Sequence, residues 1–539
     1  MSRSDRLLSA EALLMELDVL VVGAGPVGLM AAGELASRGV AVRIIDVLPE
    51  RSRFVKALGV TPRTLEIFDH IGVLGSALDR GLVSSVMNTV VNGELVSSGE
   101  TSGDQWPYDF LYLAQPETES ILERRLNQFG VSIERECRLV ELVDHGDEVE
   151  AIVERSGGDT QHLRPRWLVG CDGAHSTVRK QLGLSFDGGK YEITFLVADV
   201  ELDWDRPHDE AWKIVQLENG ELQNMLAIIP IPGNERRFRV STAIGVGGPD
   251  EPLAFPEHPE LDFVQEAVAP MLPGTGISEL RWSSTYGISH RLVPTYRTGR
   301  VLLAGDAAHI HPPIGGLGMN TGLQDAFNLG WKLSMVTRGL AGERLISSYD
   351  QERHAVGERV VRETARRMEN AMEQKEEDEQ AEIDAGTQLD VTYRGGSIVA
   401  DVAGDAAVQP GDRLPWCDGL VRNGVRRGWT LVDVLRGGDF HVLAWSGRDP
   451  GAVADLQHIM ETVRGRLGDR VGLTVINPVD DVADQDESVP VMIDACGTVA
   501  EALGDDAVVL LVRPDGHVSW MGPWTGATSV AAHVDELLA

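Results

Sequence analysis

The stretch that decides the fold is Leu17-Asp18-Val19-Leu20-Val21-Val22-Gly23-Ala24-Gly25-Pro26-Val27-Gly28. Its first half, residues 17–22, is short, apolar and rich in β-branched residues, which is typical of a buried parallel strand. Residues 23–28 predict a tight glycine turn, and residues 29–38 predict a helix. A second strand is expected at 40–45, closed by Asp46. The chain therefore begins with one β-α-β unit.

Each glycine of this turn has a physical task in binding a dinucleotide. Gly23 allows the tight turn, Gly25 lets the backbone approach a pyrophosphate, and Gly28 lets the helix pack closely against the strand. The helix N-terminus attracts the phosphates, and Asp46 is placed to accept hydrogen bonds from ribose hydroxyls. An acid here repels a 2′-phosphate, so FAD or NAD(H) is expected; the alternative is a glycine-rich turn in an unrelated α/β protein. The expected dinucleotide contacts are Gly23, Ala24, Gly25, Pro26, Val27, Gly28 and Asp46.

The remaining sequence predicts further domains, as expected for a chain of 539 residues. Between 185 and 295 alternating strands are interrupted by the turn pairs Asn219-Gly220 and Gly233-Asn234, which predict an antiparallel sheet inserted into the nucleotide-binding domain. Strand-like and helical patterns in the last third predict a small α/β domain. The expected order is an N-terminal extension at 1–16, a nucleotide-binding domain at 17–184 and 296–408 (the second part with a helical linker), a substrate-binding sheet domain at 185–295, and a C-terminal domain at 409–539.

Composition excludes several classes of partner. The formal net charge of −35 argues against nucleic acid, whose phosphates need a basic face. No apolar run approaches the roughly 20 residues that span a bilayer, so no membrane segment is expected. The first sixteen residues mix charges with leucines and lack a small-residue cleavage site, unlike a secretory signal. Four distant cysteines without a C-x-x-C pair argue against a disulfide framework or a zinc site and favour a reducing cytoplasm.

Two later motifs follow strand-like segments. The first is Cys171-Asp172-Gly173-Ala174-His175-Ser176-Thr177-Val178-Arg179, and the second is Gly305-Asp306-Ala307-Ala308-His309. Asp306 is expected at the carboxyl edge of a parallel sheet, where ligands bind; the alternative is an N-cap of the next helix. Glycines 315, 316 and 318 leave room for a flat ring, and a helix beginning near Met319-Asn320 would direct N–H groups at it. His309 and His311 lack a third ligand at suitable spacing, so no metal site is expected.

Taken in this order, the three motifs resemble those of the flavoprotein aromatic hydroxylases, or group A flavin monooxygenases. In that family the glycine-rich loop holds the FAD pyrophosphate, the G-D aspartate hydrogen-bonds the ribityl chain, and the D-G segment helps to bind FAD and the pyridine nucleotide. Gln115, ahead of an expected helix at 120–129, matches a position that often contacts the ribityl or phosphate region. The resemblance therefore implies FAD contacts at Gln115, Asp172, Gly305, Asp306, Pro313, Gly316, Leu317, Gly318, Met319 and Asn320.

The same resemblance suggests contacts for NADH or NADPH. Lys56 and Arg63 belong to a basic segment after the second strand, and Arg179 ends the D-G motif. A surface role is the alternative for Lys56 and Arg63. Only one glycine-rich β-α-β unit is convincing. Its uniqueness fits a nicotinamide nucleotide that docks transiently, without a Rossmann domain of its own. The sequence does not distinguish NADH from NADPH.

The function implied by the resemblance is that of an FAD-dependent monooxygenase. It would use NAD(P)H and O2 to hydroxylate a phenolic or polycyclic aromatic substrate through a flavin C4a-hydroperoxide. An oxygenase of the same fold that modifies an antibiotic or polyketide quinone, by epoxidation or Baeyer–Villiger insertion, is the alternative. The halogenase motif W-x-W-x-I-P is absent, and non-catalytic escort proteins of this fold have no reason to keep all three motifs. No motif identifies a catalytic base.

The resemblance also extends to the end of the chain. Residues 409–539 resemble the thioredoxin-like C-terminal domain of the phenol- and polyketide-hydroxylase branches, and 512–520 match its final hairpin. Without C-x-x-C we expect a structural or dimer-contact role, and a homodimer is left open. In the inserted sheet, Met225 and Ile229 are expected to line the substrate pocket, whereas core packing is the favoured interpretation of Trp282 and Tyr286. The fold class is α/β, with a Rossmann-like FAD domain, an inserted antiparallel sheet and a thioredoxin-like C-terminal domain.

Overall fold

A computed structural model describes residues 17–104, 106–246, 255–373, 378–401, 406–422, 425, 428–447, 453–478 and 491–539. The described residues divide into two compact units. Unit 1 comprises those within Met1–Leu65, Gly75–Ala326 and Ala355–Gln388, and unit 2 those within Glu66–Leu74, Phe327–His354 and Leu389–Ala539. The N-terminal extension expected at 1–16 lies outside the described residues. The domain boundaries expected from the sequence stay predictions, because the division into units follows compactness and not the motifs.

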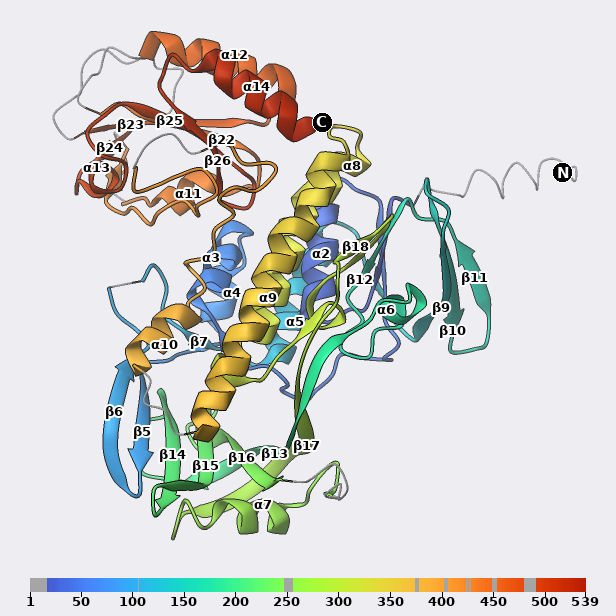
Figure 1. Cartoon of the computed structure of the whole chain (residues 1–539), viewed down its shortest axis with the longest axis vertical. Helices are drawn as coiled ribbons and strands as arrows, with labels where there is room; N and C mark the ends of the chain where they lie inside the picture. The colour runs from blue at the N-terminus through green and yellow to red at the C-terminus, as the bar shows by residue number, and fades with distance from the viewer. Residues whose placement is uncertain are drawn as a thin grey trace, which may run out of the picture. The chain divides into compact units, whose positions relative to one another are not determined.

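One sheet of unit 1 has six strands in the order β18-β19-β12-β1-β2-β8; β12 and β18 are labelled in Figure 1. β1 (Val19–Val22) is fully buried and pairs in parallel with β2 (Val42–Ile45) on one side and β12 (Trp167–Gly170) on the other. The sheet continues through β8 (Ile133–Glu134) and through β19 (Val301–Leu303) to the antiparallel edge strand β18 (Arg297–Thr298). The predicted β-α-β unit is therefore confirmed.

Helix α2 (Pro26–Ser37) starts three residues before the expected residue 29. Pro26 occupies its first turn, where the fixed φ of proline suits a helix and the missing N–H has no intrahelical partner to lose. The helix N-terminus thus lies inside the 23–28 loop, so the first N–H groups of the helix belong to the loop itself.

The second large sheet of unit 1 has the order β20-β17-β13-β16-β15-β14-β5-β6. Its antiparallel centre is formed by β13 (Asp187–Asp203), β14 (Glu210–Glu218), β15 (Glu221–Pro230), β16 (Arg237–Val246) and β17 (Gly276–Leu292). Asn219 and Gly220 both have positive φ, 54° and 84°, in the turn that joins β14 to β15, as the sequence predicted. The sheet also takes up β5 (Val86–Val91), β6 (Glu94–Glu100) and β20 (His309–Ile310) from outside residues 185–295.

The two faces of this sheet differ in what covers them. One face packs its apolar residues, among them Leu196, Phe238 and Val240, under α7 (Leu261–Val268). The opposite face carries Phe195, Met225 and Tyr286. Because successive side chains of a strand alternate between faces, this second face is available to line a site.

The remaining elements of unit 1 are short sheets and helices. A three-stranded sheet joins β9 (Cys137–Asp144), β10 (Val149–Arg155) and β11 (Thr160–Leu163), and another joins β3 (Gly59–Val60), β7 (Leu111–Tyr112) and β4 (Leu82–Val83). The helices include α3 (Pro62–His70), α4 (Leu74–Leu78), α5 (Gln115–Gln128), α6 (Thr177–Gln181) and α10 (Glu379–Gly386). The helical region expected at 319–372 is two helices, α8 (Leu317–Thr337) and α9 (Glu343–Glu373), separated where Gly339 has a φ of 70°. Helices α3, α8 and α9 each contribute residues to both units.

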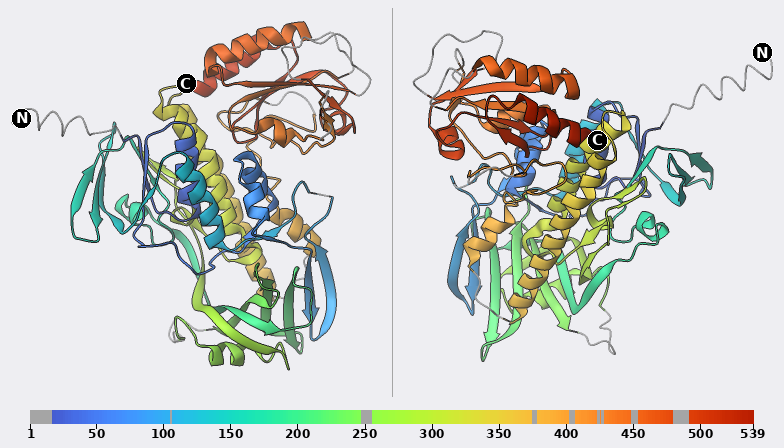
Figure 2. Two further views of the ribbon diagram at one scale, coloured as in Figure 1. Left: turned by 180° about the vertical axis from the view of Figure 1, so that it is seen from behind. Right: turned by 45° about the horizontal axis from the view of Figure 1, so that its top comes forward.

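Unit 2 contains a six-stranded sheet in the order β21-β24-β23-β22-β25-β26, which lies in the part of the chain coloured orange to red in Figure 2. Its strands are β21 (Leu420–Val421), β22 (His441–Trp445), β23 (Gly472–Pro478), β24 (Val491–Asp494), β25 (Val508–Val512) and β26 (Val518–Gly522). On β22, Val442 and Ala444 face a core closed by α12 (Val453–Leu467) and α14 (Ala527–Leu538), whereas Leu443 and Trp445 face a core closed by α11 (Leu431–Leu435) and α13 (Thr498–Leu503). Strands apolar on both faces are what a sheet covered by helices on both sides requires.

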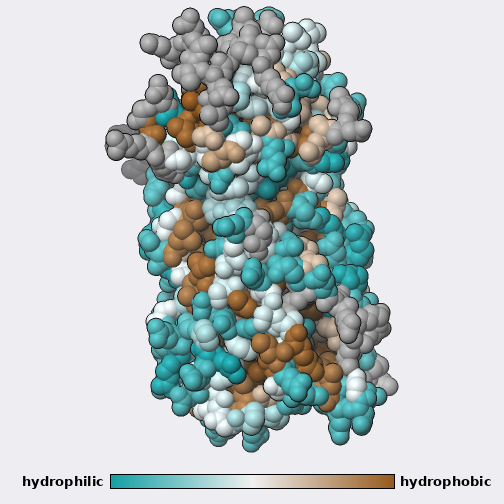
Figure 3. Space-filling model, turned by 90° about the vertical axis from the view of Figure 1, so that its left-hand side faces the viewer, coloured by the Kyte–Doolittle hydropathy of each residue, from teal (hydrophilic) through white to brown (hydrophobic). Residues whose placement is uncertain are grey.

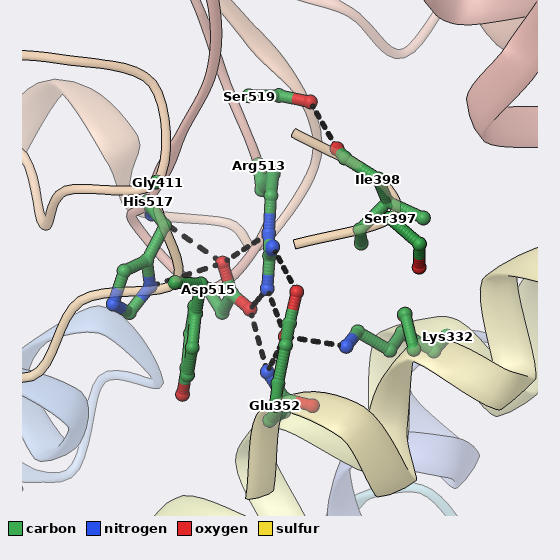
Figure 4. Close-up of polar contacts among 12 residues, drawn as sticks. Lys332, Glu352, Ser397, Ile398, Gly411, Arg513, Asp515, His517 and Ser519 are labelled. Atoms are coloured by element: carbon green, nitrogen blue, oxygen red, sulfur yellow. Dashed lines mark hydrogen bonds and ion pairs between the residues drawn. The ribbon is translucent and has the colours of Figure 1, made fainter. Parts of the chain in front are cut away.

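A buried group of charged side chains ties α8 and α9 to the C-terminal strands within unit 2 (Figure 4). Glu352 of α9 accepts hydrogen bonds from Lys332 of α8 at 2.6 Å and from Arg513 at 2.7 and 2.9 Å. Arg513 also pairs with Asp515. We call Lys332, Glu352, Arg513 and Asp515 the buried charge cluster. Its side chains alternate in sign, so each charge has an opposite neighbour in place of water.

The surface is mixed in character. On the face shown in Figure 3, apolar side chains gather in several groups among hydrophilic ones. The exposed apolar residues include Leu95 and Val96 of the edge strand β6. None of the helices within the described residues is both long and apolar enough to cross a membrane.

Candidate cofactor site

The glycine loop after β1 meets the two later motifs in space. A Cβ added at Gly23, whose φ is 100°, or at Gly28 would collide with backbone, that of Cys171 and of Gly23 respectively. A Cβ added at Gly305 would lie 2.9 Å from the side chain of Val27. The first loop therefore touches the D-G motif on one side and the G-D motif on the other. The fold itself therefore brings the three motifs together.

Gly25 differs from its neighbours. A Cβ added there meets no protein atom within 4 Å, and its φ of −73° is one that any residue adopts. Neither packing nor backbone conformation accounts for glycine at this position. Open space above the loop, next to the first turn of α2, is what a pyrophosphate would need.

Asp46 ends β2 beside this loop. One carboxylate oxygen accepts the Ala24 N–H at 2.7 Å, and the other accepts the Leu48 N–H at 2.8 Å. The side chain is thereby fixed in orientation at the carboxyl end of the parallel sheet. Its contact with a ribose stays a prediction, which this placement favours.

Asp306 lies in the short turn η1 (Gly305–Ala307) after β19. Its side chain is exposed to solvent, yet burial raises the pKa of its carboxyl, with His309 and Lys56 acting in the opposite direction. Both observations hold for a side chain that faces a recess: water reaches it, but protein surrounds it. We call the region around the 23–28 loop, Lys56, Asp306 and Gly316, where the cofactor would lie, the cofactor crevice.

Asp325 of α8 holds the G-D turn and was not identified from the sequence. Its Oδ2 accepts the Gly305 N–H at 3.1 Å and lies 2.8 Å from Nε2 of the buried His309. This contact gives His309 a hydrogen-bonding role. No motif marked Asp325, which follows Gly305 by 20 residues and reaches it only because α8 folds back along the turn.

The segment from Pro313 to Asn320 has the open backbone that a flat ring requires. Gly315 and Gly316 have φ of 78° and 65°, and a Cβ at Gly316 meets nothing within 4 Å. Helix α8 begins at Leu317, two residues before the expected start. The Asn320 side chain accepts the Thr61 N–H at 3.1 Å and donates to the carbonyls of Gly59 and Gly316 at 3.0 and 2.9 Å. Asn320 thus holds the loop in place with its side chain.

Gln115 plays a similar part for the segment that contains Lys56. Its Oε1 accepts the Ala57 N–H at 3.0 Å and its Nε2 donates to Glu119 at 2.9 Å. Lys56 precedes Ala57 and is exposed, with its charge close enough to lower the pKa of Asp306. Gln115 therefore fixes the segment that presents Lys56 to the crevice. A direct FAD contact by Gln115 stays a prediction.

The remaining charged candidates already have protein partners. Asp172 caps α6 by accepting from the Ser176 hydroxyl at 2.5 Å and the Thr177 N–H at 2.6 Å. The buried Arg179 donates to the carbonyls of Ala307 and Ala174 and lies 3.8 Å from the centre of the Phe186 ring. Arg63 is buried as well. Their cofactor and nicotinamide roles stay predictions, and for Arg179 the structure offers a positioning role at the G-D turn.

The inserted sheet provides an apolar wall near the flavin loop. Met225, Tyr286 and Ile314, the last from η2 (Ile314–Gly316), pack against one cluster that contains Phe195. Burial raises the pKa of Tyr286, whose hydroxyl is hydrogen-bonded with Ser241, so it is a neutral hydroxyl at physiological pH. Ile229 belongs to a different cluster with Leu58 and Tyr112.

The residues present fit FAD. The loop at Gly25 and the turn at Gly316 each leave open space where a side chain would otherwise stand. Asp46 and Asp306 offer carboxylates at the carboxyl end of the parallel sheet, where doubly wound folds bind ligands. Gly23 to Gly28 would hold the pyrophosphate, Asp46 the ribose, Asp306 the ribityl chain, and the 315–318 backbone the ring.

Comparison with known proteins agrees with this geometry. A model of the FAD binding domain family matches residues 16–364. The 6-methylpretetramide 4-monooxygenase of Streptomyces rimosus is 32% identical, with 96% of this chain and 93% of that protein covered. The pentachlorophenol 4-monooxygenase of Sphingobium chlorophenolicum is 34% identical over 64% of this chain and 63% of its own. A crystal structure of aklavinone-11 hydroxylase with FAD and aklavinone superposes with a TM-score of 0.79 at 25% identity, covering 97% of this chain and 99% of that one.

Proposed function

The chain belongs to the FAD-dependent aromatic monooxygenases, the group A flavoprotein family, and from this premise we propose that it hydroxylates a phenolic or polycyclic aromatic substrate with NAD(P)H and O2. The observation that carries the proposal is the convergence of the glycine loop, Asp306 and the Gly316 turn on one crevice beside an apolar wall. Relatives named for the hydroxylation of aromatic and polyketide compounds support the substrate class.

Bound FAD would supply the redox chemistry, accepting a hydride and activating O2. The protein would contribute placement and exclusion of water. N–H groups in the first turn of α8, which lack intrahelical partners, would stabilise negative charge on a ring lying against Gly316. Met225 and Phe195 would exclude water from the reacting face.

Tyr286 would orient an oxygen of the substrate. Because burial raises its pKa, the hydroxyl stays protonated near neutral pH and acts as a hydrogen-bond donor. It is therefore unsuited to accept a proton from a phenol. The base remains unassigned, and a phenolate would have to form by loss of its proton to water or to a group that the motifs do not identify.

A purified, FAD-loaded protein tests the proposal. NADH and NADPH oxidation is followed with phenol, naphthol and a hydroxylated anthraquinone, and the products are analysed by mass. We expect at least one aromatic compound to accelerate oxidation and to gain the mass of one oxygen atom. The position of the new oxygen in the product distinguishes ring hydroxylation from epoxidation and from Baeyer–Villiger insertion. If no aromatic compound accelerates NAD(P)H oxidation, the proposal is wrong. We also propose a cytoplasmic location, which rests only on the four free cysteines. A homodimer is left open.

A further inference from the structure

A cleft of about 1050 Å³ lies in unit 1, next to the cofactor crevice but lined by other residues. Arg53, Phe54 and Val55 line it, and the next residue, Lys56, acts electrostatically on Asp306 of the crevice. Ala114 also lines the cleft, directly before Gln115. The sheet residues Asp199, Arg237 and Trp282 line it as well. A ligand in the cleft would therefore contact the same segment, 53–57, that presents Lys56 to the cofactor.

The cleft contains an aromatic platform. The rings of Phe54 and Trp282 stack with their centres 5.9 Å apart and their planes 21° from parallel. Phe54 is 48% exposed, so part of its surface is open to a ligand. Arg239 lies 5.6 Å from the Trp282 ring centre and donates to the carbonyls of Val55 and Lys56, so it links the Trp282 ring to the segment that carries Phe54. One more flat ring could extend the stack on the open side of Phe54.

The charged side chains of the cleft balance one another. Four arginines line it, Arg53, Arg80, Arg237 and Arg281, together with four acids, Asp79, Glu117, Asp199 and Glu235. Arg80 pairs with Glu117 at 3.4 Å, and Asp199 with Arg239 at 2.9 Å. The Nε of Arg237 is buried and has no hydrogen-bond partner within the described residues. The phosphates of a dinucleotide would meet as many carboxylates as guanidinium groups.

We propose that this cleft binds a hydroxylated aromatic compound of several fused rings, one ring stacked on Phe54 and its oxygens hydrogen-bonded to the arginines and carboxylates. Phenolic hydroxyls both donate and accept hydrogen bonds, and quinone carbonyls accept them, which suits a wall of mixed charge. The volume is at the upper end of the roughly 300–1,000 Å³ typical of pockets for drug-sized ligands, far more than one phenol ring needs. The identity of the ligand as the aromatic substrate rests on the proposed function.

Fluorine NMR of FAD-loaded protein containing 5-fluorotryptophan tests the site locally. The Trp282 signal is assigned by its loss in Trp282→Phe, and 1,8-dihydroxyanthraquinone is then added as a three-ring probe. We expect a saturable shift of the Trp282 signal and a dissociation constant about fivefold higher in Phe54→Ala, since stacked aromatic pairs contribute about 0.5–1.5 kcal/mol. Arg237→Gln should weaken binding about twofold to tenfold through its lost hydrogen bond. Phenol at the same concentrations should leave the signal in place.

Phe129→Ala is the matched control, because Phe129 is also exposed and has an arginine, Arg125, over its ring at 5.4 Å. It should bind the probe as the wild type does. An unmoved Trp282 signal, unchanged binding in both Phe54→Ala and Arg237→Gln, or a shift produced by NADH or NADPH instead would each overturn the proposal. Binding is measured without turnover. A protein that binds the probe in the cleft but oxygenates no aromatic compound therefore contradicts the proposed function and supports the site, and the reverse result contradicts the site alone.

Discussion

Gly25 and Gly28 belong to the same motif, yet the structure requires glycine at them for different reasons. At Gly28 a side chain would collide with the Gly23 carbonyl, so the requirement is internal to the fold. At Gly25 a side chain would enter open space, so the requirement comes from a ligand. Sequence alone attributes both to dinucleotide binding and cannot separate them.

Alanine substitutions should separate the two roles. Gly25→Ala is expected to leave the melting temperature of the FAD-free protein within about 2 °C of wild type, because a surface change without packing consequences costs at most about 0.5 kcal/mol. Its affinity for FAD should fall by about tenfold or more, as a methyl group blocks the pyrophosphate. Gly28→Ala should lower both the melting temperature of the apoprotein and the affinity for FAD. FAD titration by fluorescence quenching and thermal melts of the apoprotein measure the two effects. Equal affinity for FAD in Gly25→Ala and wild type would refute the assignment of the loop.

Helices α8 and α9 depend on one another through the buried charge cluster. Burial acts to raise the pKa of Glu352, but Arg513 and Lys332 outweigh it and lower the pKa to about 2. Burial lowers the pKa of Lys332 to about 8, against the opposing effect of Glu352. Removing Glu352 would leave the buried Lys332 without its hydrogen-bonding carboxylate and Arg513 with Asp515 alone, and a buried charge left unpaired costs more than the pairing itself contributes.

Glu352→Gln should therefore destabilise unit 2 by about 3–5 kcal/mol, the usual cost of breaking a buried ion pair on one side. Glu536→Gln is the control, since Glu536 is an exposed glutamate that pairs with Arg344 at 3.5 Å. Exposed pairs contribute about 0–1 kcal/mol, so its effect should be small. Urea unfolding followed by tryptophan fluorescence compares the two. Similar midpoints for both variants would show that the cluster contributes little to stability.

At the scale of the whole molecule, acid should destabilise unit 2 before its carboxylates are protonated. Burial lowers the pKa of His441 and of His533 to about 4 in the folded state, whereas an unfolded histidine titrates near 6.5. Between these values the unfolded chain binds more protons, so stability is lost as the pH falls through this window. At pH 5 the loss is roughly 2 kcal/mol for each histidine.

His441→Gln should reduce this pH dependence. Whatever its cost at pH 7.5, the difference in free energy of unfolding between pH 7.5 and pH 5 should shrink by roughly 2 kcal/mol. Urea unfolding at both pH values provides the measurement. An undiminished pH dependence in His441→Gln would mean that this imidazole is protonated in the folded protein.

The local sequence determined the elements whose causes are local. The β-branched run at 19–22, the glycine turn after it and the Asn219-Gly220 hairpin are specified by backbone conformation and short-range pattern, and all are present in the structure. Membership of the FAD-dependent aromatic monooxygenases followed from motifs of this kind. The order of the motifs along the chain was enough to identify the family, because each motif follows one strand of the same parallel sheet.

Tertiary structure decided what depends on residues far apart in sequence. Asp325 reaches Gly305 only because α8 folds back along the G-D turn, and Phe54 meets Trp282 only because segment 53–57 crosses the inserted sheet. The capping role of Asp172 and the carbonyl contacts of Arg179 likewise follow from which atoms the fold places within hydrogen-bond distance. Periodicity and turn chemistry describe neighbours along the chain, whereas a site is made of neighbours in space, and only packing determines which those are.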